Sequence, residues 1–229
     1  LGHFKTPAVA AALSERIKRD PSYLVVAEAC RALGKTQRPE ARKLLLAATA
    51  RDSWADVVRI GALDGIGALG DSSLVDEVKA LTRYGVAERG RRAAMRALAK
   101  LSEDTAVRRH LEGLLDDPAL QVRMAVADAL VEQSGAKARE ALQSRLAREP
   151  EPRVVRHLRE TLRELEDGQA KERRRLRDEL QELKREVAEL QAKLVRLEPH
   201  EPAGHGSKTM KRTTPPARKR PERGSTRRR

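Results

Sequence analysis

The sequence has few aromatic residues, a single cysteine and no long apolar run. Only 2% of its 229 residues are Phe, Trp or Tyr, and its apolar residues are mostly Ala, Leu and Val. This composition is poor for a mixed globular core but typical of thin helix-on-helix packing, so it predicts an all-α protein. Cys30 has no second cysteine with which to form an internal disulfide, and its Ala-rich surroundings predict a small buried residue.

Neither a membrane span nor a signal sequence is recognisable in these residues. No apolar run approaches the roughly 18 residues of a membrane span, and the first residues do not resemble a signal sequence. These features fit a cytoplasmic protein. The chain begins with Leu1, inside a repeat pattern, so we expect a fragment or a processed C-terminal part whose missing start would hide any export signal.

No catalytic or metal-binding motif is present. An H-E-x-x-H motif on a helix would place two imidazoles one turn apart on a zinc ion, beside a glutamate base. The nearest approach runs from His200 to His205, whose spacing and intervening Pro202 and Gly204 prevent a helix from aligning them. We therefore predict no catalytic residue, no metal site and no cofactor in this chain.

A two-helix pattern recurs five times between Leu1 and Glu166. In each second helix, an anchor position and the positions four and eight residues later are small or aliphatic. These columns are Val25, Val58, Gly90, Val122 and Val154; Ala29, Ala62, Ala94, Val126 and Leu158; and Leu33, Ile66, Leu98, Leu130 and Leu162. The first-helix columns are Leu13, Leu46, Val78, His110 and Leu142, and Ile17, Ala50, Thr82, Leu114 and Leu146. A period in the low thirties predicts an α-solenoid of about five repeats over residues 1–166, in which neighbours bury each other's apolar faces.

Turn residues punctuate these repeats. Acid-proline pairs at Asp20-Pro21, Asp117-Pro118 and Glu149-Pro150 stand between the paired helices, where proline suits the first turn of a helix and the acid caps it. Gly34, Gly70 and Gly135 are expected to end second helices as left-handed caps.

An arginine column follows the anchor in the three middle repeats, at Arg59, Arg91 and Arg123. In one interpretation, each arginine pairs with an acid of a neighbouring repeat and the column is structural. In the other, the column forms a concave basic surface that binds an acidic or phosphate ligand.

The second helices resemble HEAT repeats, in which Val-Arg is followed by small residues, as in the segments 58–62 and 122–126. More narrowly, residues 1–166 resemble the α-helical C-terminal region of bacterial zinc aminopeptidases of the aminopeptidase N family. The segments that carry this narrower resemblance are 22–34, 53–65 with Trp54 and Asp64, and 82–94 with Tyr84.

That resemblance implies a non-catalytic module that closes over a catalytic domain encoded upstream and helps to shape its substrate chamber, with the zinc held by the other domain. Trp54 and Tyr84 join the three arginines as candidate binding residues. Two other functions stay open. One is a free-standing scaffold that binds a protein or peptide on its concave face; the other is a helical-repeat binder of nucleic acid.

The period changes after the fifth repeat. Leu176, Leu180, Leu183, Val187, Leu190, Leu194 and Leu197 follow spacings of alternately four and three residues, a heptad seam within residues 167–198. Opposite charges at Glu179 and Lys184, and at Lys193 and Glu198, would attract across a parallel dimer. The seam therefore predicts a homodimeric coiled coil, while a helix that folds back to cap the solenoid is the alternative.

Residues 199–229 carry no apolar periodicity and ten lysines and arginines against two acids, a net charge of +8 out of the chain's +14. Such a segment is expected to be a disordered basic tail. Its charge would support weak, non-specific binding to nucleic acid or another acidic partner, and a tail that only raises solubility is the alternative.

Overall fold

The computed structural model describes the backbone of residues 5–197 and the side chains of residues 5–194. Within this part, the chain forms ten α-helices, four short 3₁₀ turns and no strand. The all-α prediction is confirmed. The predicted basic tail, residues 199–229, lies outside the described residues.

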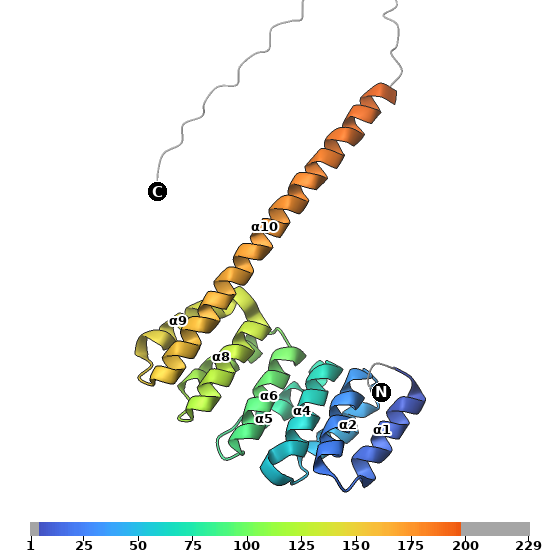
Figure 1. Ribbon diagram of the computed structural model, residues 1–229, viewed down its shortest axis with the longest axis vertical. Helices are drawn as coiled ribbons and strands as arrows, with labels where there is room; N and C mark the ends of the chain where they lie inside the picture. The colour runs from blue at the N-terminus through green and yellow to red at the C-terminus, as the bar shows by residue number, and fades with distance from the viewer. Residues whose placement is uncertain (1–4, 198–229) are drawn as a thin grey trace, which may run out of the picture. The chain divides into compact units, whose positions relative to one another are not determined.

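Five helix pairs follow one another, as the repeat pattern predicted (Figure 1). The pairs are α1 (Pro7–Arg19) with α2 (Tyr23–Lys35), α3 (Ala41–Thr49) with α4 (Val57–Leu69), α5 (Val75–Ala80) with α6 (Glu88–Leu101), α7 (Thr105–Gly113) with α8 (Leu120–Ser134), and α9 (Arg139–Arg148) with the start of α10 (Pro152–Leu197). Four 3₁₀ turns adjoin α4, α5, α7 and α9, in that order: η1 (Trp54–Asp56), η2 (Ser72–Leu74), η3 (Leu114–Asp116) and η4 (Gly135–Ala138).

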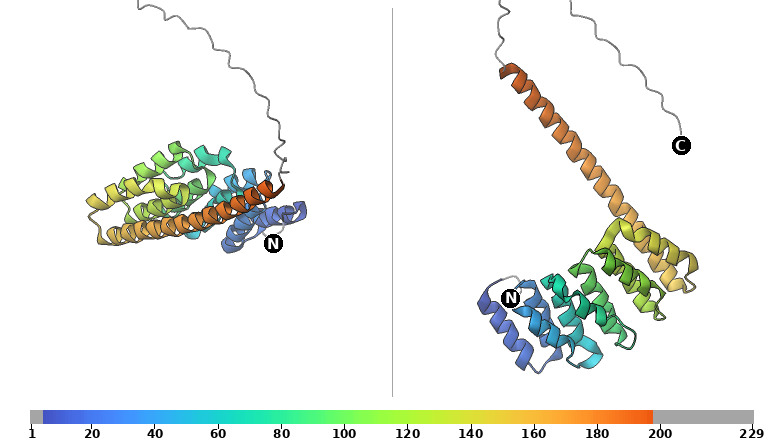
Figure 2. Two further views of the ribbon diagram at one scale, coloured as in Figure 1. Left: turned by 90° about the horizontal axis from the view of Figure 1, so that it is seen from above. Right: turned by 180° about the vertical axis from the view of Figure 1, so that it is seen from behind.

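The second helices α2, α4, α6 and α8 pack side by side as one layer (Figures 1 and 2). One continuous core runs from Leu13 in α1 to Leu162 in α10, and it is built from Leu, Val, Ile and Ala side chains. Because each helix pair buries its apolar face against its neighbours, the molecule is a helical-repeat solenoid.

The repeat period is 32 residues throughout, which corrects the anchor of the first repeat. Val25 is 42% exposed, whereas the next residue, Val26, is fully buried like Val58, Val122 and Val154. The error arose because α2 carries valine at both positions, so that the sequence pattern did not distinguish the buried residue from the exposed one.

Two first-helix columns need the same kind of correction. Leu45 and Leu111 are fully buried, whereas the predicted core positions Leu46 and His110 are only partly buried. Ala50 is exposed and Thr49 is buried in its place. The first helices differ in length and in the turns that flank them, so their register shifts by one residue between repeats.

The acid-proline pairs form turns between the paired helices as predicted, but the prolines lie before the helices and the acids do not cap them. A side-chain oxygen of each acid accepts a hydrogen bond from the backbone N–H two residues later: Ser22 on Asp20, Ala119 on Asp117 and Glu151 on Glu149, at 2.9 to 3.0 Å. These bonds close a tight turn immediately before α2, α8 and α10.

The glycine caps are only partly as predicted. Gly70 ends α4 in the left-handed conformation, with φ of 71°, and Gly135 follows α8 with φ of 50°. Gly34 is not a cap: it lies within α2, buried against α4, and Gln37 adopts the positive φ of 54° instead.

Helix α10 joins the fifth repeat to the heptad segment without interruption. Its first turns belong to the solenoid, because Val154, Leu158 and Leu162 are part of the core. The chain divides into compact units at residues 1–178 and 179–229. The sequence placed a boundary at residue 166, which falls inside this continuous helix.

Candidate interaction surfaces

Three aromatic side chains line one edge of the solenoid. Tyr23, Trp54 and Tyr84 are 45%, 77% and 83% exposed, and they lie at the turns between the paired helices of the first three repeats. These turns follow one another along the lower edge in Figure 1. Aromatic residues normally contribute large buried areas to a core, so their placement outside it marks this edge as a candidate contact surface.

The turn that carries Trp54 is tightly specified. Ala55 and Asp56 both adopt left-handed conformations, with φ of 54° and 60°, which are unfavourable for residues other than glycine. The Ser53 hydroxyl accepts a hydrogen bond from the Val58 N–H at 3.0 Å and fixes the start of α4. Tyr84 precedes Gly85, whose φ of 98° suits glycine.

The arginine column forms a ladder of ion pairs rather than an open basic surface. Arg91 pairs with Asp117 of the next repeat, and Arg123 pairs with Glu149 of the next. Both guanidinium groups are almost fully buried and also donate to backbone carbonyls, Arg91 to Thr82 and Arg123 to Asp117. Their burial removes them from any ligand-facing surface.

Arg59 departs from this ladder. It pairs with Asp56 of its own repeat and donates to the Thr49 carbonyl at 2.8 Å. The register explains the difference, because one repeat before Asp117 the chain has Gly85, which offers no carboxylate.

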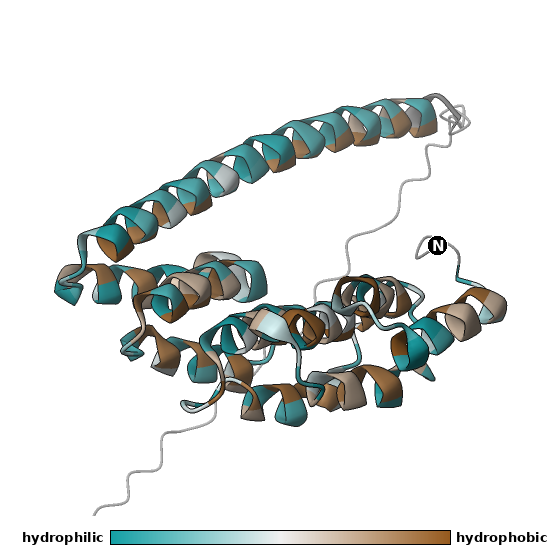
Figure 3. Cartoon of the chain, turned by 60° about the horizontal axis from the view of Figure 1, so that its bottom comes forward, coloured by the Kyte–Doolittle hydropathy of each residue, from teal (hydrophilic) through white to brown (hydrophobic). Residues whose placement is uncertain are grey.

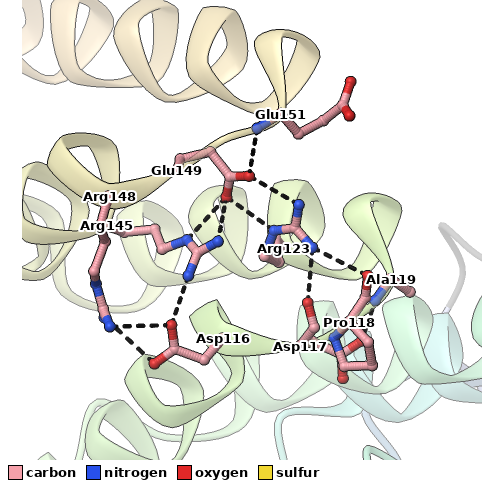
Figure 4. A network of polar contacts seen from close by, with 9 residues as sticks. All are labelled: Asp116, Asp117, Pro118, Ala119, Arg123, Arg145, Arg148, Glu149 and Glu151. Carbon is pink, nitrogen blue, oxygen red and sulfur yellow. Dashed lines mark hydrogen bonds and ion pairs between the residues drawn. The ribbon is translucent and has the colours of Figure 1, made fainter.

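Glu149 lies at the centre of the strongest polar network (Figure 4). Its side chain is completely buried. It accepts hydrogen bonds from Arg123 Nε and Nη2 at 2.9 Å and from Arg145 Nη2 at 2.6 Å. Burial alone would raise the pKa of this carboxyl, but the bonds from Arg123, Arg145 and the Glu151 N–H outweigh it and lower the pKa. The network therefore holds a charged carboxylate between two charged guanidinium groups.

Asp64, one of the residues that carry the family resemblance, connects three repeats on the second-helix layer. Its carboxylate accepts from Arg31 Nε of α2 at 3.0 Å and lies 3.5 Å from Arg96 Nη2 of α6. Both partners are partly exposed, so the contribution of each pair to stability is on the order of 1 kcal/mol or less.

A shallow apolar groove lies on the first repeat and was missed by the sequence analysis. It encloses about 520 Å³, and Leu24 and Val25, which line it, are 69% and 42% exposed. Its lining residues are Leu13, Arg16, Leu24, Val25, Glu28, Ala29 and Ala32. We call this surface the first-repeat groove.

Later repeats do not repeat this apolar surface. At successive steps of 32 residues, the positions equivalent to Val25 are Val57, Arg89, Gln121 and Arg153. Those equivalent to Ala32 are Asp64, Arg96, Asp128 and Glu160. The sequence thus contained a signal for the groove, because Val25 and Ala32 are apolar where later repeats have mostly polar residues. It was hidden because Val25 was assigned to the buried column.

His110 and Cys30 are structural residues. His110 Nε2 lies 2.9 Å from the Thr82 hydroxyl, and its pKa is lowered by burial and by the nearby charges of Lys79 and Arg83. Cys30 is completely buried, and burial raises the pKa of its thiol to about 11 against the smaller opposing effects of Arg51 and Arg31.

Within the part of the chain that the structure describes, no cluster of three or more His, Cys, Asp or Glu side chains could hold a metal ion.

Cys30 provides a probe of the folded state. Because the thiolate is the reactive form, a pKa of about 11 makes this cysteine on the order of a hundredfold less reactive at neutral pH than an ordinary thiol, before steric protection is counted. We expect a maleimide reagent to leave the folded chain unmodified and to label it completely in denaturant, as followed by mass spectrometry. Rapid labelling without denaturant would contradict the close packing of α2.

The predicted seam residues lie along one helix with their side chains uncovered. Figure 3 shows hydrophobic residues recurring along α10, and the six described members of the seam are 51% to 62% exposed. These members are Leu176, Leu180, Leu183, Val187, Leu190 and Leu194. Leu197 ends the helix, and its side chain is outside the described residues.

Comparison with known proteins agrees with the fold. Residues 1–67 match the family model described as HEAT repeats. No curated protein matches the chain. The family match and the five stacked helix pairs together support a HEAT-repeat solenoid. None of the helices formed by residues 5–197 is both long and apolar enough to cross a membrane.

Proposed function

We propose that this solenoid is a protein-binding module whose first-repeat groove contacts another folded domain. The observation that carries the proposal is the exposed pair Leu24 and Val25 in the groove, in a chain whose later repeats have mostly polar residues at the positions equivalent to Val25 and Ala32. Exposed apolar surface rimmed by charged residues, here Arg16 and Glu28, is typical of protein contact sites. Tyr23 extends the same surface toward the aromatic edge.

In its finer form, the proposal identifies the contacted domain as the catalytic domain of a zinc aminopeptidase of the aminopeptidase N family, encoded before Leu1. The resemblance in the segments around Trp54 and Tyr84 supports this identity. Both side chains are exposed and the solenoid core does not use them, so they are available to a neighbouring domain. The zinc and the catalytic residues would belong to that domain, since this chain contains no H-E-x-x-H motif.

A free-standing scaffold that binds a protein or peptide on its concave face is the alternative. It shares the first-repeat groove as a contact surface but requires no upstream peptidase. The two possibilities are separated by the coding sequence that precedes Leu1. An upstream H-E-x-x-H with a third-ligand glutamate supports the peptidase module, and its absence overturns it.

Substitution of the groove tests the contact itself. We expect Val25→Glu to weaken the interaction between the solenoid and its neighbouring domain about tenfold or more, because it places a charge in a desolvated apolar contact. Isothermal titration of this chain with the separately produced upstream domain measures the affinity.

Gln121→Glu is the matched control. It introduces the same residue at the equivalent position of the fourth repeat, where the side chain is exposed, so binding should be unchanged. Equal affinities for the Val25→Glu variant and the unsubstituted chain would show that the groove is not the contact surface.

A further inference from the structure

The apolar stripe of α10 is an unpartnered helix face with a regular register. Its described members, Leu176 to Leu194, repeat at the heptad spacing and are each about half exposed. An apolar stripe that recurs every 3.5 residues is the pattern of helices that wind around each other in a coiled coil. An exposed stripe of this length on an otherwise charged helix is therefore half of a helix–helix interface.

The heptad assignment follows from the spacing. Leu180, Val187 and Leu194 occupy a positions, and Leu176, Leu183 and Leu190 occupy d positions. The stripe ends on its N-terminal side because the preceding a and d positions hold Arg173 and Gln169. In a parallel pair every described layer joins two leucines or two valines. Leucine at every d position together with the β-branched Val187, one of the three described a residues, favours two strands.

Charges beside the stripe select the partner and its direction. In a parallel pair, each g residue faces the e residue five positions later on the other chain. The register opposes Glu172 with Arg177, Glu179 with Lys184 and Lys193 with Glu198, whereas Glu186 meets the neutral Gln191. No like charges are opposed, so the helix is complementary to a copy of itself.

Antiparallel pairing fits less well. The antiparallel register that pairs every described seam residue opposes Leu176 with Leu194, Leu180 with Leu190 and Leu183 with Val187. In this register e positions face e and g positions face g, so Lys184 would lie opposite the Lys184 of the second copy and Glu186 opposite its Glu186. Parallel pairing opposes no like charges, and it retains the attraction between Glu172 and Arg177.

We propose that this segment forms a parallel, two-stranded coiled coil with a second copy of the chain. Self-association would place two solenoids in one assembly, so each assembly carries two first-repeat grooves. Two tethered grooves would raise the apparent affinity for a partner that presents two contact sites. The dimer itself depends only on α10.

Sedimentation equilibrium of the full chain tests the proposal. At about 50 µM, a concentration at which a complex with a micromolar Kd is mostly formed, we expect twice the chain mass of 25.5 kDa. A monomer at this concentration would overturn the dimer, whether the stripe folds back on its own chain or binds a different protein. A trimer would overturn the two-stranded assembly.

Matched variants locate the interface. Leu183→Glu combined with Leu190→Glu should give a monomer with unchanged helix content, because both side chains are exposed and outside the solenoid core. Arg185→Glu combined with Ala192→Glu adds two glutamates at outer f positions and should remain dimeric. A dimer that persists in the Leu183/Leu190 variant would show that the stripe is not the interface.

A disulfide tests the direction. Leu176→Cys should form a disulfide-linked dimer under mild oxidation, because parallel pairing places the two copies of this position in one layer. The native Cys30 is buried and does not interfere. A dimer that fails to cross-link would overturn the parallel arrangement.

Discussion

Substituting Gly34 by alanine should lower the free energy of unfolding by about 3 kcal/mol or more, the upper range for overpacking. Helices α2 and α4 approach so closely that a Cβ on Gly34 would lie 1.9 Å from the carbonyl oxygen of Gly65. Gly65 and Gly61 have similarly close contacts, with Cys30 O at 2.4 Å and Ala27 Cα at 2.6 Å. Since the obstructing atoms belong to the backbone, a side-chain rotation cannot relieve the clash.

Gly113→Ala is the control for this prediction. It adds the same methyl group to the last turn of α7, where no atom lies within 4 Å of the added Cβ, and its φ of −62° suits alanine. The free energy of unfolding should stay the same or rise by up to about 1 kcal/mol. Urea titration followed by far-ultraviolet circular dichroism measures both variants. Equal stabilities for the two would contradict the close approach of α2 and α4.

Glu149→Gln is expected to lower the free energy of unfolding by about 3 to 5 kcal/mol, the usual effect of removing one member of a buried ion pair. The neutral amide would leave Arg123 without a counter-charge in a buried site, and it would remove a partner of Arg145. Thermal and urea unfolding measure the loss. Glu160→Gln, an exposed position on α10, should leave stability unchanged.

The network around Glu149 should also make the free energy of unfolding depend on pH. The pKa of Glu149 is lowered in the folded chain, so its ionisation stabilises the fold above the unfolded carboxyl pKa of about 4.3. This contribution is lost as the pH falls from there through the lowered pKa. The stability difference between the unsubstituted chain and Glu149→Gln should therefore be full at neutral pH and shrink in acid. A difference that is independent of pH would show that the charge is not what stabilises the site.

The repeat architecture was readable from the sequence because helical periodicity is a local property. Apolar residues at four-residue steps predicted the second helices, and acid-proline pairs predicted the turns between the paired helices but not their caps. The first anchor was wrong for the opposite reason: Val25 and Val26 have the same chemistry, and only contact with α4 determines which of them is buried. The left-handed cap predicted at Gly34 failed similarly, because a glycine suits both a helix end and a close helix crossing.

The arginine column illustrates how far sequence reasoning reached on the candidate site. The pairing of Arg91 and Arg123 with acids of the next repeat was one of two interpretations, and nothing in the sequence chose between them. The tertiary structure favours the pairing interpretation, because it buries Asp117 and Glu149 beside the guanidinium groups of Arg91 and Arg123. Arg59 does not pair with the next repeat, because Gly85 occupies the position there that is equivalent to Asp117 and Glu149.

The sequence by itself determined the helical repeat, its approximate period, the turns between the paired helices and the heptad stripe, all of which are set by residues close together in the chain. Only the tertiary structure decided which valine faces the core, which arginines are unavailable to a ligand, and that Leu24 and Val25 form an uncovered groove. Burial and ion pairing depend on residues from adjacent repeats, about 32 positions apart, and their relative placement is fixed only when the repeats stack.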